Sequence, residues 1–360
     1  MGPVDNNQPA PDTEGTAAST SPPPPSFTRE LALIIAVLSL GLGFIFSYVG
    51  AFHDPVPHRV NIAVAAPAKE SSRLVLQLNA ITGHPLAAHA VTAIADARRQ
   101  VQNDQTAAAL LVSPTGSKDR LLVATGGGVA LTTAVQSVIE QAERRQHRTV
   151  LTRDLAPLQT GDYRGLTGFY AVVGWLVTGY LLAALLGIAA KARDTTLRSV
   201  TRRLLILVPY SIAAGLGGSL ILDTLLAAET GHFLALAGVG ALLVFAAASV
   251  TIALQELVGI IGIGLAILLF VVLGNPSAGG AYQIPLLPGF WRTIGDALPN
   301  GAGVDTLRRI TYFHGHGITD HLIIIGAYCL AAVLIALTVT AYRTTTTQST
   351  LPSTDARAAS

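Results

Sequence analysis

Three consecutive glycines, Gly126 to Gly128, stand between an apolar stretch and an amphipathic one. This order occurs where a helix amino terminus binds phosphate, because glycines let a ligand come close to the backbone N–H groups. No lysine accompanies these glycines to pair with a phosphate. A tight glycine turn without a ligand is therefore the favoured interpretation.

Histidines form two groups that could be imagined as metal ligands. The groups are His53 with His58, and His314 with His316 and His321. Neither spacing matches a zinc signature, and the single cysteine, Cys329, lies inside an apolar run. We expect neither a metal site nor an intrachain disulfide.

Signatures of catalysis are missing from the chain. No Ser, His and Asp grouping stands in a nucleophile turn, and no stretch matches the Gly-x-x-x-x-Gly-Lys-Ser/Thr phosphate loop. The sequence thus predicts no enzyme, no cofactor and no nucleotide hydrolysis by that route. An enzyme embedded in the membrane would need polar residues clustered at one interface, which makes it the weakest of the alternatives.

The composition is that of a membrane protein. Of the 360 residues, 51% are hydrophobic and only 12% are charged, against roughly a quarter charged in soluble domains. The mean hydropathy is +0.52. With a formal net charge of +2, the chain carries no basic surface of the kind that binds nucleic acid.

Six uncharged apolar runs are long enough to span a bilayer of about 30 Å at 1.5 Å per residue. They are 31–52, 166–190, 204–222, 233–254, 257–273 and 322–342. The first is longer than the apolar part of a signal peptide and lacks a cleavage site, so we expect it to be retained. The fourth and fifth are separated only by Gln255 and Glu256, which favours a helical hairpin over a single re-entrant element.

Charges beside the spans predict their orientation, because short loops rich in Lys and Arg stay in the cytoplasm. The loop between the second and third spans carries Lys191, Arg193, Arg198, Arg202 and Arg203 against one acid. The next loop, residues 223–232, holds two acids and neither Lys nor Arg. We therefore expect a plasma-membrane protein with both termini in the cytoplasm.

The predicted fold class is an α-helical polytopic membrane protein with six spans in a one-plus-five layout and an extracytoplasmic α/β domain after the first span. The predicted parts are a disordered cytoplasmic tail (1–28), the first span, the extracytoplasmic domain (53–165), a five-helix transmembrane domain (166–342) and a second cytoplasmic tail (343–360). Inside the domain, short apolar runs predict strands and helical spacing predicts helices. The strands are 60–65, 107–112 and 121–124, and the helices are 86–102 and 129–146.

An amphipathic segment, residues 274–321, precedes the last span. Apolar residues fall at helical spacing around Trp291 and Arg292, and again from Gly301 to Phe313, a pattern typical of short interfacial or re-entrant helices. An ordinary loop is the alternative.

The absence of ionisable residues within all six runs bears on function. Carriers driven by protons or ions need such groups at membrane depth. A self-powered carrier is therefore disfavoured, and any transport would draw its energy from another protein. Glycines recur in the third, fourth and fifth runs, where they favour close helix packing within the bundle or between two copies.

This layout resembles the membrane subunit of type 2 ABC exporters. Two local stretches, SYVGAFHDPVPH (47–58) and LPGFWRTIG (287–295) followed by GAGVD (301–305), are similar to an actinobacterial subgroup related to phage-infection-protein-like membrane proteins. The resemblance covers residues 29–343 and lies in structural, not catalytic, motifs.

The resemblance implies a homodimer, or a dimer with a related membrane subunit, that exports a lipid, glycan, peptide or drug-like substrate through the bilayer. A separate cytoplasmic ATPase would supply the energy and engage the loop holding Lys191, Arg193, Arg198, Arg202 and Arg203. The chain departs from fused members of the family by lacking an ATPase domain. The alternative is a membrane-anchored envelope receptor or assembly scaffold without transport activity.

Overall fold

The computed structural model describes residues 27–190 and 196–349. Within them, five helices are long and apolar enough to cross a membrane, and a small α/β sheet is present. The five spans are Glu30–Phe52, Thr167–Ala189, Leu197–Leu225, Phe233–Val258 and Thr319–Thr345. The chain divides into two compact units between Ser39 and Leu40. The described part of the first unit is the beginning of helix α1 (Phe27–Phe52), and all other elements belong to the second.

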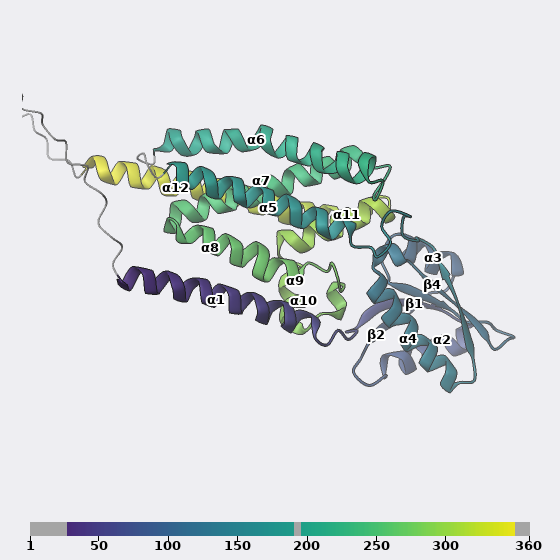
Figure 1. Cartoon of the computed structure of the whole chain (residues 1–360). Coiled ribbons are helices and arrows are strands. Elements are labelled where there is room, and N and C mark those ends of the chain that lie inside the picture. Colours follow the sequence, from purple (N-terminus) through teal and green to yellow (C-terminus); the bar gives the residue numbers. More distant parts are fainter. Residues whose placement is uncertain (1–26, 191–195, 350–360) are drawn as a thin grey trace, which may run out of the picture. The chain divides into compact units, whose positions relative to one another are not determined.

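Helix α7 is the centre of the helical bundle in the second unit, and α5, α6 and α12 all pack against it (Figure 1). The bounds are α5 Thr167–Ala190, α6 Leu197–Ser219 continuing into a π-helical turn η2 Leu220–Leu225, α7 Phe233–Val258 and α12 Thr319–Ser349. Small residues let the helices approach closely. A side chain at Gly179 or Gly215 would overlap the backbone of α7. Packing inside the bundle therefore explains these glycines.

The fourth and fifth predicted spans form a tight hairpin, as expected, but its turn lies later in the chain. Helix α7 continues through Gln255 and Glu256, and the chain reverses at Gly259, whose φ of +66° suits glycine. The returning segment consists of α8 Ile261–Ile267, a π-helical turn η3 Leu268–Gly274 and α9 Asn275–Ser277. The run Ile261–Ser277 is shorter than the five spans, about 26 Å at 1.5 Å per residue.

After α9, the amphipathic segment before α12 contains three further helical elements. They are the 3₁₀ turn η4 Ile284–Leu286, α10 Gly289–Gly295 and α11 Pro299–Tyr312. Helix α11 is neither a loop nor a surface helix, because most of it is buried against α5, α7 and α12. Its first turn is small enough to fit there, since a side chain at Gly301 would overlap the Gly295 backbone.

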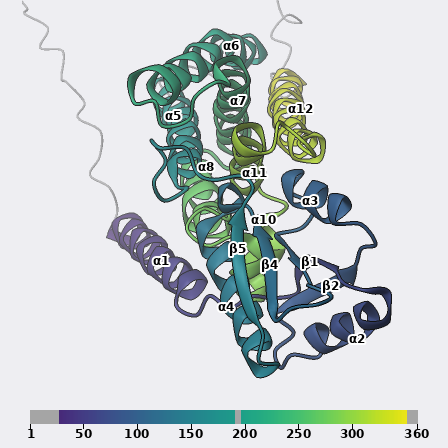
Figure 2. The same ribbon diagram turned by 90° about the vertical axis from the view of Figure 1, so that its right-hand side faces the viewer.

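The α/β part contains a five-stranded sheet of order β2-β1-β3-β4-β5, in which only the β3–β4 pair is antiparallel. Figure 2 looks onto its strands. The strands are β1 Val60–Ala65, β2 Leu86–Ala90, β3 Ala108–Leu111, β4 Lys118–Val123 and β5 Thr149–Asp154. The helices are α2 Ala68–Asn79, α3 Ile94–Gln102 and α4 Val129–Arg145, with a 3₁₀ turn η1 Thr125–Gly127.

Each face of the sheet has its own apolar core. Helices α2 and α4 cover one face, where Leu78 and Ile139 pack on Ile62. Helix α3 covers the other face together with Phe313, a fully buried residue that directly follows α11. The bundle therefore contributes a side chain to the core of the α/β part.

The predicted helix 86–102 is wrong in its first third. Leu86–Ala90 forms strand β2, which pairs in parallel with β1 in the register Val60↔Leu86. Alanine-rich LAAHA has no β preference of its own, so tertiary pairing decides its conformation. Helix α2 and strand β5 were not predicted, because their polar residues hide the apolar spacing.

Candidate functional site

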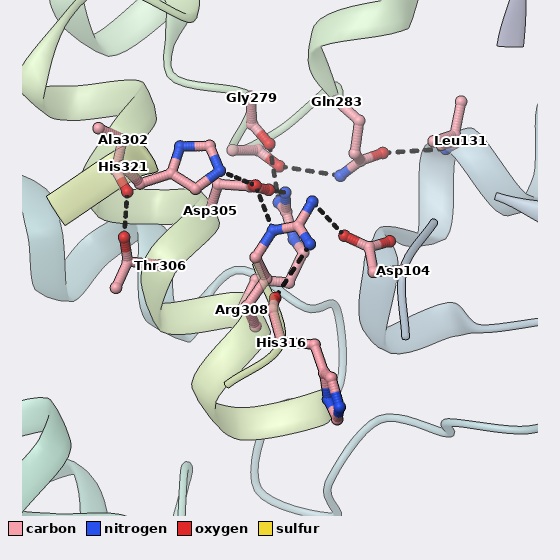
Figure 3. A network of polar contacts seen from close by, with 12 residues as sticks. Asp104, Leu131, Gly279, Gln283, Ala302, Asp305, Thr306, Arg308, His316 and His321 are labelled. Carbon is pink, nitrogen blue, oxygen red and sulfur yellow. Dashed lines mark hydrogen bonds and ion pairs between the residues drawn. The ribbon is translucent and has the colours of Figure 1, made fainter. Parts of the chain in front are cut away.

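The carboxyl end of α11 carries a group of charges that we call the junction cluster. It consists of Asp104, Asp305, Arg308, Arg309 and His321. Asp104 follows α3 in the α/β part, the next three residues lie on α11, and His321 lies in the first turn of α12. Figure 3 shows side chains from these three elements converging.

Arg309 joins the α/β part to the bundle through two carboxylates. Its Nη2 lies 2.9 Å from Asp104 Oδ2, and its Nε donates to Asp305 Oδ2 at 2.8 Å. The spacing of Asp305 and Arg309, four residues apart on one helix, brings their side chains together. A third bond runs from Nη1 of Arg309 to the carbonyl of His316 at 3.1 Å.

Asp305 is the centre of the junction cluster. His321 Nε2 lies 2.9 Å from its Oδ2, and Arg308 Nη1 lies 3.4 Å from its Oδ1. Arg308 also donates to the carbonyl of Gly279 at 2.8 Å, which ties α11 to the segment after α9. One carboxylate is thus shared among three nitrogen-bearing side chains.

The two aspartates of the cluster titrate in opposite directions. Burial raises the pKa of Asp104 to about 6, and the positive charge of Arg309 only partly offsets this. Burial alone would also raise the pKa of Asp305, but the hydrogen bond from His321 and the charges of Arg308 and Arg309 hold it well below its usual range. Asp305 is therefore ionised at neutral pH, and Asp104 changes charge near pH 6.

A second link joins α11 to the amino terminus of α5. Asp162 accepts hydrogen bonds from the Thr167 N–H at 3.0 Å and from the Tyr312 hydroxyl at 2.8 Å. Glu229 accepts one from the Thr311 hydroxyl at 3.1 Å. Both carboxylates are buried, with 3% and 2% exposure, and negative charge is favoured at a helix amino terminus.

Glu229 is held close to neutrality. Burial, and then the nearby charge of Asp162, raise its pKa to about 7. Burial and the hydrogen bond to Asp162 likewise raise the pKa of Tyr312, so this hydroxyl remains a donor.

The three glycines are a turn, as predicted, and serve close packing at the same junction. A side chain at Gly126 would overlap the ring of Tyr312, and one at Gly128 would overlap Gln283. Gln283 in turn accepts from the N–H of Leu131 at 2.9 Å, near the start of α4. Gly128 has φ +133°, a conformation that other residues rarely adopt.

A second polar site lies near the start of α6, the end of α7 and Thr340 of α12. We call it the buried ion pair. Arg203 Nη1 lies 3.0 Å from Glu256 Oε1. Only 5% of the surface of Arg203 and 4% of that of Glu256 are exposed. Arg203 Nη2 donates to Gln255 Oε1 at 2.7 Å, and the Thr340 hydroxyl donates to Glu256 Oε2 at 3.4 Å. The pair thus connects α6, α7 and α12.

The residues of the predicted basic loop fall into three groups. Lys191 and Arg193 lie outside the described residues. Arg198 and Arg202 are exposed in the first turns of α6. Arg203 lies in the same helix and belongs to the buried ion pair, so the prediction that these three arginines lie in a loop was wrong. The helix begins at Leu197 because the Thr196 hydroxyl accepts from the Ser199 N–H at 3.2 Å and caps it.

The two polar sites lie about one hydrocarbon thickness apart. Helix α12 takes part in both, through His321 and Thr340, which a rise of 1.5 Å per residue places about 28 Å apart. The hydrocarbon core of a bilayer is about 30 Å thick. Ionic groups at these two levels suit helices that cross a membrane.

The histidines have roles in hydrogen bonding. His321 contacts Asp305, and His316 accepts from Arg309 through its carbonyl. Across residues 27–190 and 196–349, no group of three or more His, Cys, Asp or Glu side chains is arranged to hold a metal ion. The arrangement therefore offers ion pairs and hydrogen bonds between elements.

The two local stretches of the resemblance contact each other. Trp291 Nε1 donates to Ser47 Oγ at 3.2 Å, and Ser47 donates to the carbonyl of Val272 at 2.5 Å. Trp291 also packs with Ala51 and Leu287 in a small core. These stretches thus fasten the end of α1 to the short helices.

Sequence reasoning missed most of the polar sites. Asp104, Asp162 and Glu229 lie in connecting segments that have no pattern of their own. Asp305 with Arg308 and Arg309, at helical spacing, was a usable signal, and so was the Gln255–Glu256 pair between two apolar runs. Comparisons of the chain with known protein families, curated proteins and solved structures found no match.

Proposed function

We propose that this protein is the membrane subunit of an exporter powered by a separate cytoplasmic ATPase. In this proposal six spans, including the shorter run Ile261–Ser277, cross the plasma membrane. Both termini and the basic start of α6 lie in the cytoplasm, and the α/β part lies outside. The cargo is a lipid, glycan, peptide or drug-like molecule.

The observation that carries the proposal is the pair of polar sites joined by helix α12. A buried ion pair is costly to desolvate and stabilises little compared with apolar packing, so its presence favours a role in specific positioning. Arg203 and Glu256 hold the ends of α6, α7 and α12 together. A force on the exposed turn with Arg198 and Arg202 would therefore reach three helices at once.

The junction cluster links helix α12 to the α/β part. His321, in the first turn of α12, contacts Asp305 on α11, and Arg309 on α11 contacts Asp104 of the α/β part. Movement of α12 relative to α7 would thus be transmitted to the outer part. Packed helices with fixed ionic contacts carry such displacements as discrete shifts.

The direct test is purification of the full chain in mild detergent from its host, with mass spectrometry of the proteins that accompany it. We expect a stoichiometric cytoplasmic ATPase. A double variant, R198E/R202E, should abolish this association while leaving Arg203 and its pair intact. The matched control is R98E/R120E, which replaces two exposed arginines of the α/β part and should retain the ATPase.

Two outcomes would overturn the proposal. Retention of the ATPase by R198E/R202E would remove the coupling role of this turn. Recovery of envelope proteins without an ATPase would favour the second candidate, an anchored receptor or scaffold. That candidate would use the bundle only to hold the α/β part at the membrane.

Placement of the α/β part has its own test. Cys329 is buried, so a C329S chain carrying the single substitution S117C in the exposed turn before β4 is a clean probe. A membrane-impermeant maleimide should label it in intact cells. Labelling only after lysis would reverse the proposed orientation.

A further inference from the structure

Helices α2 and α4 cover one face of the sheet, and a groove lies between them. Its larger, mainly apolar part has a volume of about 640 Å³ and is lined by Val56, Leu78, Ile81, Val138 and Ala142 among others. Binding sites for small molecules usually have volumes of about 300–1,000 Å³ and mainly apolar walls.

A smaller, polar hollow of about 240 Å³ adjoins the apolar part. Gln77 of α2 and Gln146, just after α4, line both hollows. The charged residues that line the polar hollow are Glu70, Arg73, Glu143 and Arg148. The groove is therefore amphipathic along its length, with hydrocarbon at one end and charged groups at the other.

One arginine without an ion pair among the described residues, Arg73, lines the polar hollow, and a second, Arg145, lines the apolar part. Arg148 is neutralised by Asp119, to which its Nε donates at 2.6 Å. Arg73, and Arg145 on the wall of the apolar part, are exposed and form no ion pair in the described part of the chain. Two guanidinium groups are thus free to bind an anion, and guanidinium groups match carboxylates in geometry.

Glu143 weakens the negative charge of the hollow. Burial, and then the hydrogen bond and charge of Asp119, raise its pKa to about 7. Its Oε2 is buried without a hydrogen-bond partner in the part of the chain that the structure describes. This oxygen lies 3.6 Å from Arg148 Nε, and the proton that Glu143 shares with Asp119 lowers the negative charge facing the hollow.

We propose that the α2–α4 groove binds a single-chain anionic amphiphile, with its carboxylate at Arg73 and Arg145 and its hydrocarbon chain over Leu78, Ile81 and Val138. The enclosed volume suits one chain better than a protein helix. The free arginines select the anionic head. This binding does not depend on the exporter function.

The test uses the full chain in phosphatidylcholine nanodiscs and a fatty acid that carries a photoreactive diazirine in its chain. After irradiation, mass spectrometry should find cross-links in residues 56–58, 77–85 and 138–146. Unlabelled oleate should remove these cross-links, whereas an alcohol or an amine of the same chain length should not.

Two variants separate the head from the chain. R73E/R145E should reduce groove cross-linking about tenfold or more, as expected for the loss of charge-assisted hydrogen bonds. A142F should reduce it by filling the apolar part without changing any charge. R98E on α3, at the opposite face, should leave it unchanged.

Each variant must elute as a single species, and cross-links to the spanning helices serve as an internal reference. Cross-links confined to the spanning helices would show partition into the bilayer only and would overturn the proposal. Equal competition by the alcohol or the amine would overturn the assignment of an anionic ligand. Unchanged groove cross-linking in both R73E/R145E and A142F would overturn the assignment of the groove as the binding site.

Discussion

The junction cluster and the buried ion pair lie toward opposite ends of α12 and differ in how each charge is compensated. Asp305 is shared by Arg308, Arg309 and His321. In the buried ion pair, Arg203 has one carboxylate and one amide as partners, and its Nε has none in the described part of the chain.

The two sites differ in which charges stay paired after one charged side chain is removed. In a network, the remaining charges can pair again with each other or with water. In the buried ion pair, the surviving charge keeps only a neutral partner, Gln255 for Arg203 or Thr340 for Glu256, and most of its desolvation cost is no longer offset. We therefore expect substitutions in the junction cluster to cost less stability than substitutions in the buried ion pair.

Replacement of Arg203 should have the largest effect. R203M leaves Glu256 charged and buried, and the loss of one partner of a buried pair costs about 3–5 kcal/mol. Denaturant unfolding in detergent micelles would measure this cost. The double variant R203M/E256M should recover most of it. A cost below about 1 kcal/mol for R203M would contradict the expectation that the buried ion pair is the less tolerant site.

D305N should cost less, about 2 kcal/mol at pH 7, since it removes charged hydrogen bonds but leaves Arg309 paired with Asp104. The pKa of Asp305 is lowered in the folded state, so its contribution is present above the ordinary aspartate pKa and is lost as pH falls below it. Unfolding measured from pH 3 to pH 8 should show the gap between D305N and wild type closing toward the acid end. A constant gap would contradict the ionic origin.

E229Q should act with the opposite sign. Because the folded pKa of Glu229 is raised to about 7, its charged form destabilises the fold, and stability falls as pH rises from the ordinary glutamate pKa through about 7. The variant should therefore be more stable than wild type by about 1 kcal/mol at pH 8 and equal to it at pH 4. Thermal unfolding at both pH values tests this, and a loss of stability at pH 8 would exclude it.

Y312F should have the smallest destabilising effect, about 1.5 kcal/mol, the lower end for a hydrogen bond to a charged group. It removes one hydrogen bond to Asp162, which keeps its bond from Thr167. Denaturant unfolding of Y312F should be compared with that of Y163F, which replaces an exposed tyrosine. A loss above about 3 kcal/mol would show that this junction is as intolerant as the buried pair.

Much of the architecture follows from the sequence alone. Uncharged apolar runs predict the long helices, because their side chains have no favourable place in water. Short apolar runs predict β1 and β3, and helical spacing predicts α4, to within one residue of their observed bounds. The strand predicted at 121–124, by contrast, begins three residues later than β4. The fifth run, which proves shorter than a full span, and the strand Leu86–Ala90 mark where these local patterns stop being sufficient.

The sequence by itself determined which segments are apolar enough for a membrane and where the α/β part begins, since hydrophobicity and periodicity are properties of neighbouring residues. Only the tertiary structure decided that Arg203 meets Glu256 and that Arg309 joins Asp104 to Asp305. Asp104 and Arg309 are far apart in the chain, and nothing near either one records its partner. Such pairings arise only when packing brings distant elements together and burial makes an unpaired charge too costly.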